Sequence, residues 1–154
     1  MADEPLYHIA QINTGRIRYE TDDERMTEFM NNLDRINALA ERSPGFVWRL
    51  MDATNNATNI RIFEDPFLLQ NMSVWETIED LEQFTYKTAH THFLERKEEW
   101  FQPDADSHIA LWWVESDRFP TAEEGHEKVE YLKINGPTPL AFTFAERFPP
   151  PGFK

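Results

Sequence analysis

The stretch HIALWWV, residues 108–114, decides the fold more than any other part of the sequence. Neighbouring residues of a strand point to opposite faces of its sheet, and here both sets are mostly apolar. A strand of this kind is buried on both faces, as the adjacent Trp112 and Trp113 illustrate. Something must therefore cover each side of the sheet to which this strand belongs.

Three other strands and two long helices are predicted around it. The helix over residues 24–42 follows from apolar residues at spacings of three and four, and Ser43-Pro44-Gly45 ends it. Thr77 precedes acidic residues and begins a second helix that is expected to reach Trp100 or Phe101. The remaining strand candidates are residues 7–13, 46–51 and 68–75.

The order strand–helix–strand–strand–helix–strand over residues 6–116 predicts an α+β, ferredoxin-like βαββαβ fold. A capping box, Thr121 with Glu124, begins an extra helix over residues 120–134, and the Pro-rich tail 145–154 is expected to be extended. We predict one domain over residues 1–154. Right-handed crossovers place both long helices on one face of the sheet. Because the chain has no second layer left for the open face, we expect a second copy to cover it, as a homodimer.

Composition excludes several classes of partner. The chain has 28 acidic and 15 basic residues and a net charge of −13, which disfavours binding to nucleic acid and to anionic membranes. It has no cysteine and no apolar run long enough to span a bilayer, so we expect a cytoplasmic protein. Phosphate-binding loops, nucleophile elbows and HExxH zinc motifs are also missing from the sequence.

Several segments resemble a bacterial family known only as a domain of unknown function. The resemblance covers residues 6–144 and rests on YHIAQINTGR (7–16), SPGFVWRL (43–50), NMSVWE (71–76), FTY (84–86), LWWV (111–114) and GPT (136–138), with His90, Arg96, Trp100 and Phe101. It implies the dimeric α+β barrel superfamily of antibiotic-biosynthesis-type monooxygenases. Two sheets then close one barrel across a dimer. The implied function is binding of a small apolar or aromatic ligand, with cofactor-independent oxygenase or isomerase chemistry. The sequence leaves open whether the protein is an enzyme. If it is one, the resemblance implies a monooxygenase-like oxidoreductase.

A shorter segment is similar to haem-containing carotenoid monooxygenases. It comprises SVWE (73–76) followed by Phe84, His90, Arg96 and Trp100. This similarity implies haem, with His90 as axial ligand, as the alternative to a protein without cofactor. A non-catalytic dimeric ligand-binding module is the third hypothesis.

Asn71, Ser73 and Trp75 alternate along one strand and therefore share a face. They indicate either a ligand pocket between sheet and helices or a hydrogen-bonded core. In the strand 46–51, strict alternation places Phe46, Trp48 and Leu50 on one face and Val47, Arg49 and Met51 on the other. Arg49 and Arg96 are expected to hold a ligand oxygen or to pair with acids such as Glu95 or Glu99. Trp48 and Trp112 are counted with the ligand-binding candidates.

The catalytic candidates are His90 and Tyr86. His90 and His92 lie on nearly opposite sides of a straight helix, so they cannot share a metal ion, and we predict no metal site. The helical pattern favours His92 as the inward residue, whereas the family resemblance favours His90 as general acid or base. A kink near Tyr86–Thr88 would turn His90 inward. Tyr86 is either a hydroxyl donor to the pocket or a half-buried aromatic residue.

Overall fold

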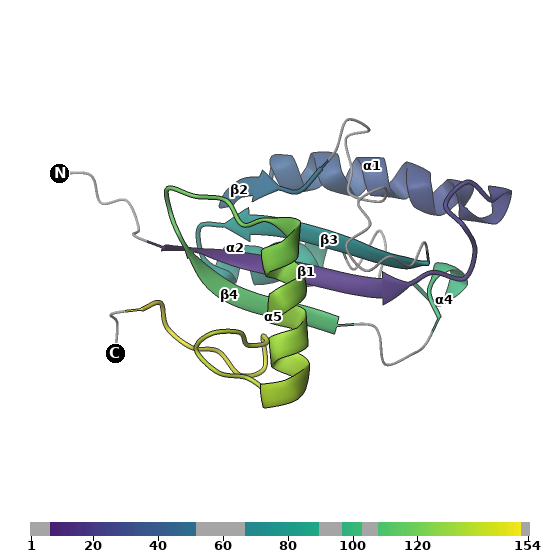
Figure 1. The fold of residues 1–154 in the computed structure, drawn as a ribbon. Helices are drawn as coiled ribbons and strands as arrows, with labels where there is room; N and C mark the ends of the chain where they lie inside the picture. The colour runs from purple at the N-terminus through teal and green to yellow at the C-terminus, as the bar shows by residue number, and fades with distance from the viewer. Residues whose placement is uncertain (1–6, 52–66, 90–96, 103–107, 152–154) are drawn as a thin grey trace.

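The computed structural model describes residues 7–51, 67–89, 97–102 and 108–151. Its sheet has four antiparallel strands in the order β2-β3-β1-β4, which is the predicted ferredoxin-like α+β fold (Figure 1). The strands are β1 (Tyr7–Arg16), β2 (Phe46–Arg49), β3 (Leu68–Trp75) and β4 (His108–Glu115). The helices are η1 (Glu24–Met26), α1 (Thr27–Glu41), α2 (Ile78–Gln83), the π-helix η2 (Phe84–Ala89), α4 (Lys97–Trp100) and α5 (Ala122–Asn135).

One face of the sheet carries α1 and α2. Ile9 of β1, Trp75 of β3 and Leu111 of β4 are fully buried there. They pack against Ala40 of α1 and against Ile78 and Leu81 of α2. A separate cluster lies toward the other end of β1 and joins Ile17, Met26, Phe29, Leu69 and Trp100. The helical layer is therefore anchored at both ends of this face.

The opposite face carries α5, which crosses the sheet in front of β1 and β4 (Figure 1). Val129 of α5 packs with Ala10, Ile12, Trp112 and other residues of this face. Gly125 lets the helix approach closely, since a Cβ there would lie 2.8 Å from both Ile12 Cδ1 and Met72 Sδ. The expectation that the chain has no second layer for this face is therefore wrong, and the argument for a dimer that rests on it is withdrawn.

Strand β2 departs from strict alternation at its centre. Phe46 is opposite Trp75 and Trp48 is opposite Val74, so Val47 is an extra residue in a β-bulge. After the bulge the faces are exchanged: Phe46 and Arg49 lie on the α1–α2 side, and Trp48 lies on the α5 side. The predicted faces were therefore wrong for Phe46 and Val47, whereas Trp48 and Leu50 share a face as predicted, with Arg49 on the other.

The predicted helix starts are confirmed by their caps. Thr77 Oγ1 accepts a hydrogen bond from Asp80 N at 3.0 Å, and Thr121 Oγ1 accepts one from Glu124 N at 3.1 Å. The second helix is not one straight α-helix, because α2 passes into the π-helix η2 after Gln83. This change of helical geometry covers the segment in which a kink was expected. Residues 90–96, which include both helical histidines, lie outside the described residues.

The C-terminal tail lies along the free side of β4. Leu111 and Phe142 form an antiparallel bridge, with N–H···O distances of 2.8 and 2.9 Å between their backbones. Further along, Trp113 Nε1 donates to the Phe148 carbonyl oxygen at 2.8 Å. The neighbouring Ala141 forms a second isolated bridge, with Thr138.

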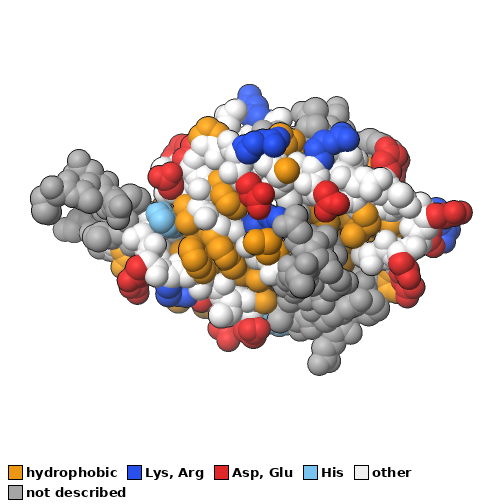
Figure 2. All heavy atoms as spheres, turned by 90° about the horizontal axis from the view of Figure 1, so that it is seen from above, with side chains coloured by type: hydrophobic (Ala, Val, Ile, Leu, Met, Phe, Trp, Pro, Cys, Tyr) orange, Lys and Arg blue, Asp and Glu red, His pale blue; other side chains and the backbone are white. Residues whose placement is uncertain are grey.

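The surface reflects the excess of acidic residues. Figure 2 shows the molecule from above, with acidic and basic side chains spread around hydrophobic ones. Among the helices in the described ranges, none combines the length and the apolar character needed to cross a bilayer.

Candidate functional site

A polar row crosses the centre of the face that carries α1 and α2. Arg49 of β2 is opposite Ser73 of β3, and Ser73 is opposite Gln11 of β1. All three residues are buried, with exposed fractions of 4–7%. Buried polar groups of this kind need hydrogen-bond partners, because an unpaired one costs about 1–3 kcal/mol.

Gln11 supplies most of these hydrogen bonds. Its Nε2 donates to Ser73 Oγ at 2.8 Å and to Asn71 Oδ1 at 3.0 Å. Trp75 Nε1 also donates to Ser73 Oγ, at 2.8 Å. The four residues Gln11, Asn71, Ser73 and Trp75 therefore form one connected group, which we call the β1–β3 polar cluster.

The indole of Trp75 is held firmly beside this cluster. Phe84, the first residue of η2, stacks on it with ring centroids 5.1 Å apart. Phe46 meets it edge-on at 5.5 Å, and the hydrogen bond to Ser73 fixes the third direction. Trp75 is fully buried, so it provides a rigid aromatic wall beside the polar groups.

The hydrogen bonds leave a defined set of unused groups in the cluster. Ser73 Oγ accepts two hydrogen bonds, so its own proton is available to a third oxygen. Asn71 accepts through Oδ1 and keeps its Nδ2 donors, whereas Gln11 keeps Oε1 as an acceptor. No other described residue contacts these remaining groups through a hydrogen bond. The cluster therefore retains unused donors on two residues, Ser73 and Asn71.

The cluster is open on one side. Asn71 and Asn13 face each other on β3 and β1, and both are exposed. On either side of this pair, the same face of the sheet is covered by a hydrophobic cluster, one containing Trp75 and the other containing Trp100. Solvent thus reaches the sheet between the two anchored ends of the helical layer, at the position of the polar cluster.

Arg49 borders the cluster on β2 and forms an ion pair. Its Nε donates to Glu41 Oε2, at the end of α1, at 3.0 Å. The Arg49 side chain is 4% exposed and that of Glu41 is 43% exposed. Arg49 thus pairs with an acid, as the alternative prediction has it, and the acid is Glu41, which that prediction did not name. Arg49 is a fixed positive charge at the edge of the site.

The structure does not bring all predicted site residues together. Trp48 and Trp112 lie on the opposite face, where Trp112 Nε1 donates to Glu124 Oε2 at 2.8 Å. Tyr86 is 52% exposed and meets the ring of Phe144 edge-on at 5.4 Å, away from the cluster. His90 and Arg96 lie outside the described residues, so the proposed proton carrier and the haem ligand remain predictions.

Gln11 is the member of the site that sequence reasoning missed. It stands in β1 between Ala10 and Ile12, where a single polar residue is not distinctive. The available signal was its position one strand away from Ser73, which becomes visible only when the β1–β3 register is known. Within the described ranges, no group of three or more histidine, aspartate or glutamate side chains could hold a metal ion.

Comparison with known proteins identifies the family and the fold. Residues 8–154 match the family described as "Domain of unknown function (DUF3291)". No curated protein matches the chain. A conserved protein of Methanosarcina mazei Go1 shares the fold with a TM-score of 0.52 and 14% identity, over 70% of this chain and 92% of its own.

Two further solved structures resemble the chain. A protein of Shewanella oneidensis has a TM-score of 0.52 and 10% identity, over 71% of this chain and 93% of its own. SnoaB, a cofactor-independent oxygenase of Streptomyces nogalater, has a TM-score of 0.48 and 14% identity, over 75% of this chain and 97% of its own. Identities this low show a shared fold and nothing of activity. The chain belongs to the DUF3291 family, as the sequence resemblance implied.

Proposed function

We propose that this member of the DUF3291 family binds a small, largely apolar molecule whose carbonyl or phenolic oxygen lies against the β1–β3 polar cluster. The observation that supports this most directly is the pair of unused donors, Ser73 Oγ–H and Asn71 Nδ2–H, beside the fixed ring of Trp75. Ligand sites typically combine apolar walls with a few placed polar groups in this way.

The reaction we assign to this site is proton transfer at a carbon next to the ligand carbonyl. The C–H bond breaks, the proton passes to a base, and the electron pair moves to the oxygen as an enolate. Donors from Ser73 and Asn71 stabilise that oxygen as its charge develops. His90 is the proposed base. This step is shared by isomerisation and by cofactor-independent oxidation with dioxygen.

Binding can be tested with anthrone, a flat tricyclic ketone that has an acidic ring CH₂. We expect anthrone to quench tryptophan fluorescence in a saturable manner. Asn71→Ala should raise its Kd about fivefold or more, the effect of losing one hydrogen bond to the ligand. Asn31→Ala is the matched control, because Asn31 is exposed on α1 and has no part in the cluster. Equal effects of the two substitutions would show that the site is wrongly placed.

The reaction can be tested with the same molecule under nitrogen in D₂O. We expect the protein to accelerate deuterium exchange at the anthrone CH₂ above the rate in buffer. His90→Ala should remove the acceleration but leave anthrone binding in place. Binding without accelerated exchange would refute the proposed reaction and favour a non-catalytic ligand-binding module.

A homodimer remains part of the proposal, now on a different surface. The rings of Trp48 and Phe119 are nearly parallel, with centroids 5.3 Å apart, on the α5 side of β2. Phe119 is 54% exposed, so this pair of rings leaves an apolar surface open to solvent. Exposed apolar side chains of this size favour contact with a partner, and we assign this patch to a second copy of the chain.

A further inference from the structure

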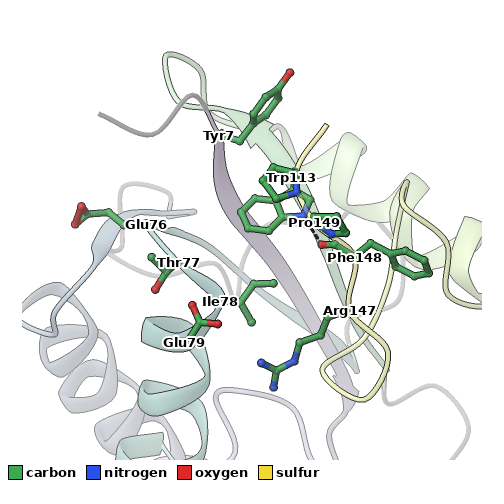
Figure 3. Close-up of a pocket in the computed structure, with 10 residues that line it drawn as sticks. Tyr7, Glu76, Thr77, Ile78, Glu79, Trp113, Arg147, Phe148 and Pro149 are labelled. Carbon is green, nitrogen blue, oxygen red and sulfur yellow. Dashed lines mark hydrogen bonds between the residues drawn. The ribbon is translucent and has the colours of Figure 1, made fainter. Parts of the chain in front are cut away.

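A hollow lies at the edge of the sheet, between α2 and the C-terminal tail. Its volume is about 400 Å³, which is within the range of small-molecule sites. The apolar part of its wall consists of Tyr7, Ile78, Trp113, Phe148, Pro149 and Pro150. None of these residues belongs to the β1–β3 polar cluster, so this hollow is a separate site. We call it the tail pocket (Figure 3).

The tail side of the pocket is fixed by three contacts. Trp113 Nε1 donates to the Phe148 carbonyl oxygen at 2.8 Å, as the dashed line in Figure 3 shows. Arg147 pairs with Glu82 of α2, and its Nε donates to the Phe144 carbonyl oxygen at 2.8 Å. Because the indole N–H of Trp113 is engaged with the tail, the ring contributes only its apolar surface to the pocket.

The charged groups of the pocket are unequally used. Arg147 is the one cation among the lining residues, and its charge is balanced by Glu82. Glu76 and Glu79 have no ion pair or hydrogen bond with another described residue. Figure 3 shows Glu79 on the side of α2 that faces Arg147 and the tail, whereas the carboxylate of Glu76 points away from the other labelled residues. The pocket therefore has one free negative charge beside its aromatic wall.

We propose that the tail pocket binds a small organic cation, an alkylated ammonium group, with Glu79 supplying the charge and Trp113 the aromatic surface. Aromatic faces attract such cations through the negative charge of their π-systems, and the carboxylate adds to that attraction. A phosphate or carboxylate ligand would instead be repelled by Glu79, because the one cation of the lining, Arg147, is already paired with Glu82. The overall charge of −13 also favours cations near this surface.

The test compares choline with its neutral isostere 3,3-dimethylbutan-1-ol, which has the same shape without the charge. Both are titrated into the ¹⁵N-labelled full chain at constant ionic strength. The reporter is the indole N–H resonance of Trp113, assigned from its disappearance in Trp113→Phe. We expect choline to shift this resonance in a saturable manner and to bind more tightly than the isostere.

Two substitutions that change the net charge equally separate the pocket from the general surface. Glu79→Gln should raise the Kd for choline about two- to fivefold, the size of an exposed ion pair. Glu76→Gln should change it much less, because that carboxylate points away. The proposal is overturned if Trp113 does not respond, if the isostere binds as well as choline, or if the two substitutions have equal effects.

Discussion

Ser73 is the residue on which the polar cluster depends. Its Oγ accepts hydrogen bonds from two buried donors, Gln11 Nε2 and Trp75 Nε1. In Ser73→Ala the buried Trp75 Nε1 loses its acceptor, and Gln11 Nε2 keeps only its hydrogen bond to Asn71 Oδ1. We expect the free energy of unfolding to fall by about 1–3 kcal/mol, measured by urea denaturation. Asn71→Ala removes an exposed acceptor and should cost less, so a larger loss for Asn71→Ala would contradict this assignment.

The sequence alone predicts the positions of some residues of the site. Period-two alternation correctly places Asn71, Ser73 and Trp75 on one face, because β3 is regular. It fails for Phe46 and Val47, because the bulge at Val47 exchanges the faces of β2 there, and nothing in the sequence marks that bulge. Partners far apart in sequence, such as Gln11 and Ser73, depend on strand register, which local patterns do not determine.

The contact between α5 and the sheet can be tested at Gly125. A Cβ at this position would lie 2.8 Å from Ile12 Cδ1 and Met72 Sδ, and both of those side chains are fully buried. The higher helix propensity of alanine favours the substitution by about 1 kcal/mol, but crowding of a packed core costs about 1–3 kcal/mol. We expect Gly125→Ala to be destabilising overall by about 1 kcal/mol in urea denaturation. Glu127→Ala, exposed on the same helix, is the control, and a gain of stability in Gly125→Ala would show that α5 does not pack as described.

Glu124 links α5 to the sheet in a pH-dependent way. Burial opposes its ionisation, but hydrogen bonds from Arg118 and Trp112 outweigh burial and lower its pKa from the ordinary value of 4.5. A lowered folded-state pKa adds stability above 4.5 that is lost as the pH falls below 4.5. Thermal melts should therefore show wild type more stable than Glu124→Gln at pH 7, with the difference shrinking from about pH 4.5 downward. A difference that is independent of pH would exclude the ionised carboxylate as its cause.

Element boundaries follow from the sequence where a cap or a breaker marks them. Thr77, Thr121 and Ser43-Pro44-Gly45 correctly locate helix ends, because capping is a local interaction. The π-helix after Gln83 has no such local mark. A pattern of apolar residues fits an α-helix and a π-helix almost equally over one turn, so the sequence predicts one continuous helix.

The proposed dimer is tested at the scale of the whole molecule. We expect native mass spectrometry to show a dimer for the wild type and a monomer for Phe119→Glu, because this exposed side chain would place charge in the contact. Ile134→Glu is the control, since Ile134 is 81% exposed at the far end of α5. A monomeric wild type would refute the dimer, and dissociation by Ile134→Glu alone would place the contact elsewhere.

The arrangement of layers was only partly predictable. The doubly apolar strand at residues 108–114 correctly requires cover on both faces of the sheet. It does not say whether that cover comes from the same chain or from a second copy. Helix α5 has few apolar residues for a core helix, and its approach depends on Gly125, whose role appears only when Ile12 and Met72 are placed beneath it.

The central claim is that a ligand oxygen binds at the β1–β3 polar cluster, and one titration tests it most directly. The five tryptophans give separate indole N–H signals from distinct parts of the molecule, with Trp75 at the cluster, Trp113 at the tail pocket and Trp112 on the α5 face. With anthrone added to ¹⁵N-labelled protein, we expect the Trp75 indole and the Gln11 side-chain amide to shift in a saturable manner, while Trp112 stays unchanged. Shifts at Trp112 without shifts at Trp75, or no saturable shift at all, would contradict the claim.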